Sequence, residues 1–264
     1  MRYTLGFIGV GNMGSALLFS ALRSVSADKI AICDSDSEKT ELFSTAYGVS
    51  VVTTDEIAAN AEFVILGVKP YGVAGVIESI LPYLSNDTTI VSMAAGVSLG
   101  QISHYLGDDT RSIIRIMPNT PCTVGMGVIE YVAVNTADEK KEKFVQAFSA
   151  AGLLDEIDES RIDAASALSG CGPAFVYLFA EALADGAVEC GLSRDKAILY
   201  AAKTLQGAGK MLEEYGSPGD LKDAVCSPGG TTIAGVHALE KGGLRGAAMD
   251  AVVAAYEKTL KLQK

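Results

Sequence analysis

Apolar runs of strand length alternate with amphipathic segments along the chain from Tyr3 to about Asp155. The strand-like runs cover residues 4–9, 29–33, 63–68, 89–93, 112–117 and 127–134. Apolar residues recur with helical spacing at residues 13–22, 38–47, 71–84 and 139–150. Strands that alternate with helices in this way predict parallel βαβ units, with helices covering both faces of one sheet.

The pattern changes after about Glu159, where no further run has strand character. Segments rich in Ala and Leu predict helices at residues 164–191, 193–214, 221–226 and 231–258. Gly191 followed by Ser193 is typical of a helix stop and a new N-cap, and residues 215–220 have a similar composition. We therefore expect an α/β domain at residues 1–159 and an all-helical domain at residues 160–264. Because the helices are apolar on several faces, we expect the second domain to form a homodimer.

Composition narrows the class of protein. The 264 residues fit two domains, and 49% hydrophobic residues with a mean hydropathy of +0.28 argue against disorder. The net charge of -11, without a basic stripe, makes nucleic acid an improbable partner. The uncharged stretches 88–107 and 164–180 are interrupted by polar residues, Gly or Pro, so no membrane span is expected. Without a targeting signal, CxxC pair or His cluster, we expect a cytoplasmic protein with reduced thiols and no metal site.

A glycine-rich turn follows the first predicted strand. Gly9, Gly11 and Gly14 match the pattern G-x-G-x-x-G, between an apolar strand and an apolar-periodic helix. In such a turn the first glycine permits the tight bend, the second lets a pyrophosphate approach the backbone, and the third allows close helix–strand packing. Asp34 ends the next strand, where a carboxylate would bind the adenosine ribose. This context predicts a Rossmann dinucleotide-binding domain, against the alternative of a purely structural turn.

The segment Asp34–Asp36 bears on cofactor choice. Two carboxylates would repel a ribose 2′-phosphate, and no Arg follows immediately to bind one. On charge alone we expect NADH to be preferred over NADPH. The alternative is that Asp34 and Asp36 only cap the following helix, which would leave the preference open.

Loops at the ends of the later strands are candidates for the nicotinamide side of the site. They cover residues 67–70, 94–96 and 117–121. We expect the following residues to lie beside the cofactor: Lys69, Ala95, Asn119 and Thr120. The alternatives are a solvated loop lysine at 69, and a turn at 119–120 whose polar groups only satisfy the backbone.

Two further loops lie in the helical half, at residues 169–174 and 227–232. The second contains Gly229 and Gly230 directly before a predicted helix. Amides at a helix N-terminus suit a carboxylate, and the Thr231 and Thr232 hydroxyls add donors. From the residues alone, anion binding and simple helix capping by Thr231 or Thr232 are equally supported.

Several motifs together resemble the pyrroline-5-carboxylate reductase family. They are FIGVGNMG at 7–14, GVKP at 67–70, SMAAG at 92–96, MPNTP at 117–121, SGCGPAF at 169–175 and LKDAVCSPGGTTIAGVHALEKGGLR at 221–245. The match spans the whole chain in order. The resemblance implies an N-terminal Rossmann domain, a helical dimerisation domain, and reduction of 1-pyrroline-5-carboxylate to L-proline, the last step of proline biosynthesis, with NADH or NADPH.

The resemblance also assigns residues to roles. The substrate loop would comprise Ser227, Gly229, Gly230, Thr231 and Thr232, with amides on the carboxylate and Thr232 on the ring nitrogen. The pyrophosphate would lie on Ile8, Gly9, Val10, Gly11, Asn12 and Met13. The cofactor ribose would contact Gly67, Val68, Lys69 and Pro70, and the adenosine side would contact Thr54. The family places its active site at the dimer interface.

Two departures from the family pattern stand out. Cys171 replaces a common serine, which weakens any hydrogen bonding there. Asp34-Ser35 replaces a phosphate-suited Asn-Arg pair, which agrees with NADH preference. Three cysteines fall in predicted active-site loops: Cys122, Cys171 and Cys226. One interpretation is that reagents that modify thiols inhibit the protein; the alternative is that these cysteines are small residues filling tight turns.

Competing functions are less well supported. A β-hydroxyacid dehydrogenase would need a catalytic lysine on the helix after the first domain, but residues 164–189 contain none. A nucleotide-sensing protein without chemistry would not need the intact 227–232 loop. His237 lies five residues beyond Thr232 and is interpreted as a packed or surface residue.

Overall fold

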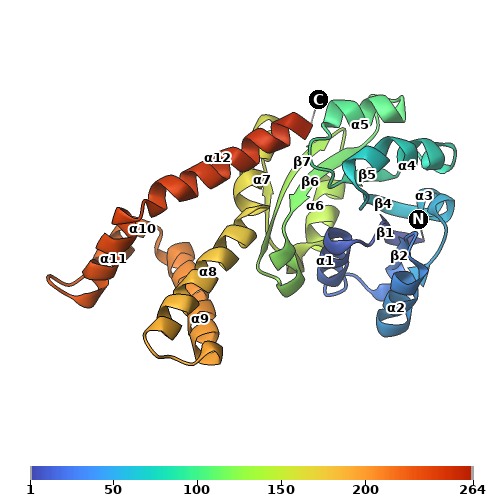
Figure 1. Cartoon of the computed structure of the whole chain (residues 1–264). Helices are drawn as coiled ribbons and strands as arrows, with labels where there is room; N and C mark the ends of the chain where they lie inside the picture. Colours follow the sequence, from blue (N-terminus) through green and yellow to red (C-terminus); the bar gives the residue numbers. More distant parts are fainter. Residues whose placement is uncertain (1, 263–264) are drawn as a thin grey trace. The chain divides into compact units, whose positions relative to one another are not determined.

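The computed structural model describes residues 2–262 and divides into two compact units (Figure 1). The first unit contains the chain up to residue 171 together with the C-terminal segment from residue 255. The second unit contains residues 172–254. Each unit is described by itself.

One eight-stranded sheet forms the centre of the first unit, in the order β3-β2-β1-β4-β5-β6-β7-β8. The strands are β1 (Tyr3–Ile8), β2 (Ile30–Cys33), β3 (Ser50–Val51), β4 (Ala61–Leu66), β5 (Thr89–Ser92), β6 (Ile113–Pro118), β7 (Gly127–Val134) and β8 (Gly152–Glu156). The mostly parallel α/β arrangement confirms the predicted fold class. The prediction of parallel pairing is wrong for β7, which runs antiparallel to β6. A parallel crossover needs a dozen or more residues, whereas only residues 119–126 join these two strands.

Helices cover both faces of the sheet, as predicted. They are α1 (Asn12–Ala21), α2 (Ser37–Tyr47), α3 (Thr54–Asn60), α4 (Val73–Ile80), α5 (Leu99–Leu106), α6 (Asp138–Ala147) and α7 (Glu159–Ser169). The short 3-10 turns are η1 (Ala27–Lys29), η2 (Pro70–Gly72), η3 (Leu81–Tyr83), η4 (Thr120–Val124) and η5 (Ser149–Ala151). Phe7 packs with α1, α2 and α6 in one core, whereas the next residue, Ile8, packs with α3, α4 and α5 in the other. Adjacent strand residues point to opposite faces, so β1 contributes to both cores.

The second unit consists of helices joined by short loops, as predicted. Its helices are α8 (Gly172–Glu189), α9 (Arg194–Tyr215), α10 (Pro218–Ala224), α11 (Thr231–Lys241) and α12 (Leu244–Leu262), the last of which continues into the first unit. The predicted single helix at 231–258 is wrong, because it breaks at Gly242 and Gly243, where Gly243 has a φ of +76°. The predicted helix at 164–191 likewise breaks between α7 and α8.

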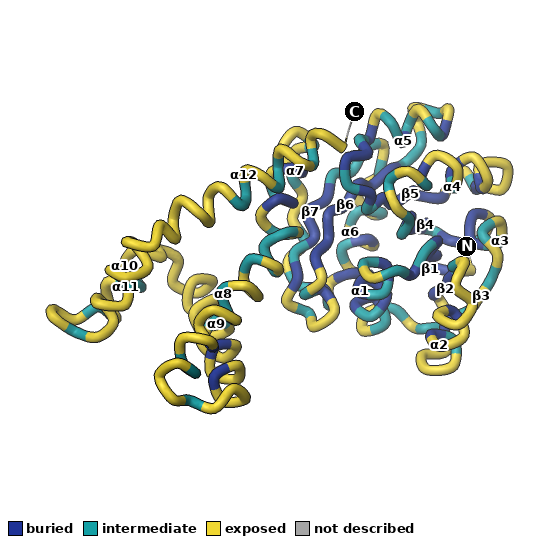
Figure 2. Tube along the Cα trace, in the orientation of Figure 1, coloured by how far each residue is buried: buried dark blue, intermediate teal, exposed yellow. Residues whose placement is uncertain are grey.

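Little of the second unit is buried in the single chain. Its small core consists of Ala184, Ala197 and Ala201. Large apolar side chains such as Tyr177, Leu178 and Ile198 are exposed, and Figure 2 shows these helices as largely exposed tubes. Exposed apolar surface of this extent is typical of a subunit interface.

By length and composition alone, the stretch Glu159–Glu189 is apolar enough to cross a membrane, and 11% of its most apolar window is buried. Two separate helices, α7 and α8, make up this stretch, and they meet at Gly170 and Cys171. Their apolar side chains also suit a face covered by a partner subunit, so the absence of a membrane span stays a prediction.

Candidate active site

The glycine-rich turn lies between β1 and α1. Gly9 has a φ of +97°, and a Cβ there would lie 2.8 Å from the carbonyl carbon and oxygen of Gly67. A Cβ on Gly14 would lie 2.5 Å from the Gly9 oxygen. These contacts confirm the predicted tight turn and close packing. Gly11 differs, because a Cβ there would meet no protein atom within 4 Å. The second glycine of the pattern therefore faces open space.

A hollow of about 470 Å³ opens beside this turn, at the carboxyl ends of β1, β2 and β4. It is lined by eight of the predicted cofactor residues: Ile8, Gly9, Gly11, Asp34, Thr54, Gly67, Val68 and Lys69. The structure brings together segments from four separate parts of the chain. The predicted residues outside this lining are Val10, Asn12, Met13, Pro70, Ala95, Asn119 and Thr120.

Asp34 is fixed by backbone amides. Its Oδ2 accepts a hydrogen bond from the Val10 amide at 2.7 Å, and its Oδ1 accepts one from the Asp36 amide at 2.9 Å. Burial opposes ionisation, but these amide bonds and the charge of Lys39 outweigh it and lower the pKa of Asp34 below its ordinary value. A carboxylate with two such bonds retains acceptor capacity for ribose hydroxyls. The capping alternative is correct for Asp36, which caps α2, but not for Asp34.

Several residues in the hollow were not predicted as cofactor contacts: Cys33, Ser35, Lys39, Tyr71 and Gly72. Lys39 is the most consequential, because it places a cation beside Asp34. Its Nζ lies 3.4 Å from the Asp36 carboxylate, and about half of each side chain is exposed. The sequence offered a clue to the position of Lys39. Asp36 is a candidate N-cap of the next helix, and residues three apart at a helix start lie close together, so Lys39 is expected near Asp36.

Asn119 makes structural hydrogen bonds. It is 5% exposed, its Nδ2 donates to the Ser169 carbonyl at 3.0 Å, and its Oδ1 accepts from the Val128 amide at 2.9 Å. The side chain thus satisfies the backbone, which was the second of the two alternatives. The expected position of Asn119 beside the cofactor stays a prediction. Thr120 is exposed at the start of η4, and Ala95 is half-buried in its turn.

The candidate substrate loop belongs to the second unit. Gly230 is the N-cap of α11, and no side chain caps this helix end. Thr231 and Thr232 are exposed residues inside the first turn, so the capping alternative is wrong for both. Gly229 has a φ of +69°, and Gly230 approaches the Ser227 side chain too closely for a Cβ. The Gly230 amide donates to the Ser227 carbonyl at 3.0 Å, whereas the Thr231 and Thr232 amides have no backbone partner among residues 2–262. These two amides and two hydroxyls at a helix N-terminus suit a carboxylate.

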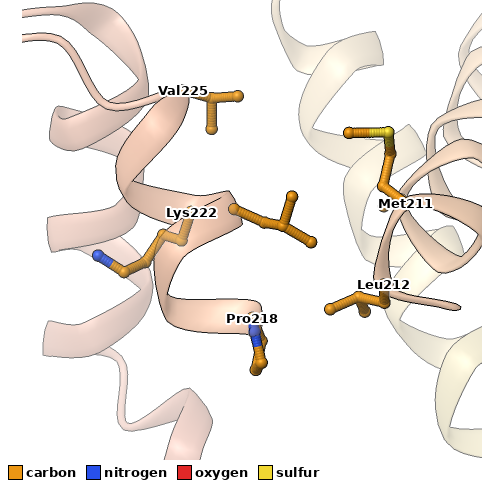
Figure 3. Close-up of a pocket in the computed structure, with 7 residues that line it drawn as sticks. Met211, Leu212, Pro218, Lys222 and Val225 are labelled. Atoms are coloured by element: carbon orange, nitrogen blue, oxygen red, sulfur yellow. The ribbon is translucent and has the colours of Figure 1, made fainter. Parts of the chain in front are cut away.

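An apolar groove of about 330 Å³ lies between α9 and α10 (Figure 3). Its lining includes Met211, Leu212, Pro218, Leu221 and Val225. The charged end of Lys222, which pairs with Asp223, points away from Met211 and Leu212. With so few polar groups, this groove suits apolar packing better than recognition of a small charged substrate.

Two cysteines have raised thiol pKa values. Cys122 is fully buried, and this burial raises its pKa above the ordinary value. A buried thiol with a raised pKa is a poor nucleophile, which favours the alternative that Cys122 is a small residue filling a tight turn. Burial, followed by the charges of Asp34 and Asp55, also raises the pKa of Cys33. Cys171 and Cys226 are half-buried. Within residues 2–262, no cluster of three or more acidic, His or Cys residues could hold a metal ion.

The sheet, the glycine-rich turn and the adjoining hollow define a dinucleotide-binding oxidoreductase of the Rossmann class. A family model described as "NADP oxidoreductase coenzyme F420-dependent" matches residues 4–96. A second, described as "Pyrroline-5-carboxylate reductase dimerisation", matches residues 159–262. The helical second half thus matches a dimerisation domain of known type.

Full-length relatives identify the family. A pyrroline-5-carboxylate reductase of Pisum sativum is 41% identical over 98% of this chain and 96% of that protein. The Escherichia coli K12 reductase is 38% identical over 100% of both chains. The solved pyrroline carboxylate reductase of Plasmodium falciparum, with NADP bound, has a TM-score of 0.88 at 32% identity, covering 100% of this chain and 99% of that one. The chain belongs to the pyrroline-5-carboxylate reductase family.

Proposed function

We propose that this protein reduces 1-pyrroline-5-carboxylate to L-proline with a reduced nicotinamide dinucleotide. The observation that carries the proposal is the full-length relationship to reductases of this name, which includes both the hollow and the 227–232 loop. We expect purified protein to oxidise NADH or NADPH when pyrroline-5-carboxylate is added, with proline formed in equal amount. Cofactor oxidation without proline, or no oxidation with either cofactor, would contradict the proposal.

The residues around the hollow fit a dinucleotide. Gly11 leaves open space beside the N-terminus of α1, where backbone amides attract a pyrophosphate. The ionised Asp34 lies where the adenosine ribose hydroxyls would donate hydrogen bonds. Val68 and Lys69 on the adjoining loop would contact the cofactor ribose. When bound, the dihydronicotinamide supplies the hydride that reduces the imine carbon.

The 227–232 loop is the proposed substrate site. The Thr231 and Thr232 amides and the partial positive charge of the α11 N-terminus would bind the substrate carboxylate. The Thr232 hydroxyl would hydrogen-bond the ring nitrogen and orient the imine carbon toward the hydride donor. A protonated imine is already electrophilic, so orientation suffices in place of a strong general acid. His237 is exposed, and α8 carries no lysine of the kind that an alcohol dehydrogenase would use.

Cofactor preference follows from the charges around the adenosine ribose. We propose that NADH is preferred, because the Asp34 carboxylate both binds ribose hydroxyls and repels a 2′-phosphate. Lys39 in the same hollow gives a phosphate one cationic partner, so NADPH is also accepted.

Replacing Lys39 by alanine should impair NADPH use selectively. We expect kcat/KM for NADPH to fall about fivefold, the effect of one half-exposed ion pair, with kcat/KM for NADH within about twofold. Steady-state kinetics with both cofactors measure this difference. Lys29→Ala, on an exposed lysine outside the hollow, is the matched control. Equal losses with the two cofactors would show that Lys39 does not recognise the phosphate.

We propose that the domain at residues 1–159 binds the cofactor, and that the domain at residues 160–264 binds the substrate and forms the dimer. Exposed apolar side chains of α8 and α9, together with the groove between α9 and α10, support self-association as a homodimer. We place the enzyme in the cytoplasm.

A further inference from the structure

Tyr71 is an exposed aromatic residue that lines the hollow beside the glycine-rich turn. It belongs to η2 and is 90% exposed, more than any other large apolar or aromatic side chain among residues 2–262. Within the same residues its side chain has no hydrogen bond, ion pair or ring contact. The ring therefore contributes nothing to the packing of the fold, and it offers apolar surface that a ligand in the hollow can cover.

The backbone that carries Tyr71 is fixed, although the ring is free. The Gly72 amide donates to the Lys69 carbonyl at 2.8 Å, which closes the turn around Tyr71. Where the same loop leaves β4, the Gly67 amide donates to the Ile8 carbonyl at 2.8 Å and ties the loop to the glycine-rich turn. Only the two side-chain torsions of the tyrosine then have to be ordered when a ligand binds, so the entropic cost of using this ring is small.

The other residues of the hollow indicate which end of a dinucleotide lies beside this ring. Tyr71 follows β4 and Asp34 follows β2, and these strands flank β1, so the two residues come from loops on either side of the glycine-rich turn. Asp34 is the proposed partner of the adenosine ribose, whereas the residues expected beside the nicotinamide, Ala95, Asn119 and Thr120, lie outside the lining. Adenine is bonded directly to that ribose, while the nicotinamide is separated from it by the pyrophosphate and a second ribose. The base that reaches Tyr71 is therefore adenine.

We propose that Tyr71 binds the cofactor by stacking its ring on the adenine. Every nucleobase has a flat π-face, and an aromatic side chain is the usual partner for it. Tyr71 is the aromatic residue among those that line the hollow, whereas Tyr47 and Tyr83 are also exposed but lie outside the lining. The role rests on the proposed function, because it requires that the hollow binds NADH or NADPH. Since both cofactors carry the same adenine, Tyr71 contributes equally to each, unlike Lys39.

The experiment compares Tyr71→Ala, which removes the ring, with Tyr71→Phe, which keeps it. We expect Tyr71→Ala to raise Kd for NADH, NADPH and ADP-ribose alike by about 10-fold, the effect of losing one base–aromatic stack. Tyr71→Phe should stay within about twofold of wild type. Titration of cofactor fluorescence measures the first two values, and displacement of NADH measures the third. Thermal unfolding of both variants should stay within about 2 °C of wild type, because the exposed ring has no partner among residues 2–262.

A tryptophan at this position reports the stacking directly. The chain contains no tryptophan, so Tyr71→Trp carries a single indole whose emission can be followed without background. ADP-ribose, which does not absorb indole emission, should quench this fluorescence with the same Kd as in the displacement experiment. Ribose 5-phosphate, which has no base, should leave it unchanged. Tyr83→Trp, at an exposed tyrosine outside the hollow, is the matched control and should respond to neither ligand.

Three results would overturn the stacking role: ADP-ribose bound by Tyr71→Ala within twofold of wild type, Tyr71→Phe as impaired as Tyr71→Ala, or no quenching of Tyr71→Trp by ADP-ribose. In each case wild-type protein would still bind its cofactor and form proline. Wild-type protein that binds NADH or NADPH but forms no proline would overturn the proposed reaction and leave the stacking role standing. Wild-type protein that binds neither cofactor would overturn both.

Discussion

Replacing Gly11 by valine should give a folded protein that no longer binds its cofactor well. A Cβ at Gly11 meets no protein atom within 4 Å, and its φ of -63° is open to any residue. The added methyl groups would instead fill the hollow where a pyrophosphate would approach. We expect Kd for NADH to rise about 100-fold, equivalent to a steric penalty of about 3 kcal/mol. Titration of NADH fluorescence measures the loss, and thermal unfolding should stay within about 2 °C of wild type.

Gly14→Ala provides the matched contrast. Its Cβ would lie 2.5 Å from the Gly9 oxygen, so the helix and the turn must move apart. This variant should lose stability as well as cofactor affinity. If Gly11→Val bound NADH within threefold of wild type, or unfolded as readily as Gly14→Ala, the pyrophosphate would not lie against Gly11.

Thr232→Ala should lower kcat about 10- to 100-fold while leaving Kd for the cofactor unchanged. The proposed hydrogen bond joins the hydroxyl to a charged ring nitrogen, and such bonds contribute about 1.5–3 kcal/mol. Thr232 is exposed in the first turn of α11, and no structural hydrogen bond involves its hydroxyl among residues 2–262, so truncation should spare the fold. Steady-state kinetics and NADH titration separate the two effects.

Thr232→Ser keeps the hydroxyl and should restore most of the turnover. Unchanged kcat in Thr232→Ala would exclude this residue as the group on the ring nitrogen. A serine variant as impaired as alanine would point to a packing role for the methyl group instead.

Local patterns in the sequence predicted most of the fold. The strand-length runs at residues 4–9, 29–33 and 63–68 were found from apolar residues bounded by turn residues, and the sheet contains a strand at each of them, ending at Ile8, Cys33 and Leu66. The weakest elements escaped prediction: β3 has two residues, and β8 contains Asp155 and Glu156 at its exposed end. Neither has the length or apolar pattern that distinguishes a strand from a loop.

The parts of the candidate site that are formed by the backbone could be predicted from the sequence. The glycine spacing in the turn after β1 and in the 227–232 loop marks close approaches of the main chain, which are encoded in neighbouring residues. Side-chain roles were less predictable. Lys39 was overlooked because only the assembled fold brings this residue of helix α2 into the hollow with residues from other segments.

The sequence by itself determined the alternation of strands and helices, the helical second half and the glycine turns, because side-chain periodicity and turn chemistry act between residues close in the chain. Only the tertiary structure decided the direction of β7, the hydrogen bonds of the Asn119 side chain and the burial of Glu130. These depend on partners far apart in sequence: Asn119 bonds a carbonyl 50 residues away. Burial and hydrogen bonding of a side chain are properties of the assembled fold, and they give Asn119 a structural role that its place in the sequence did not reveal.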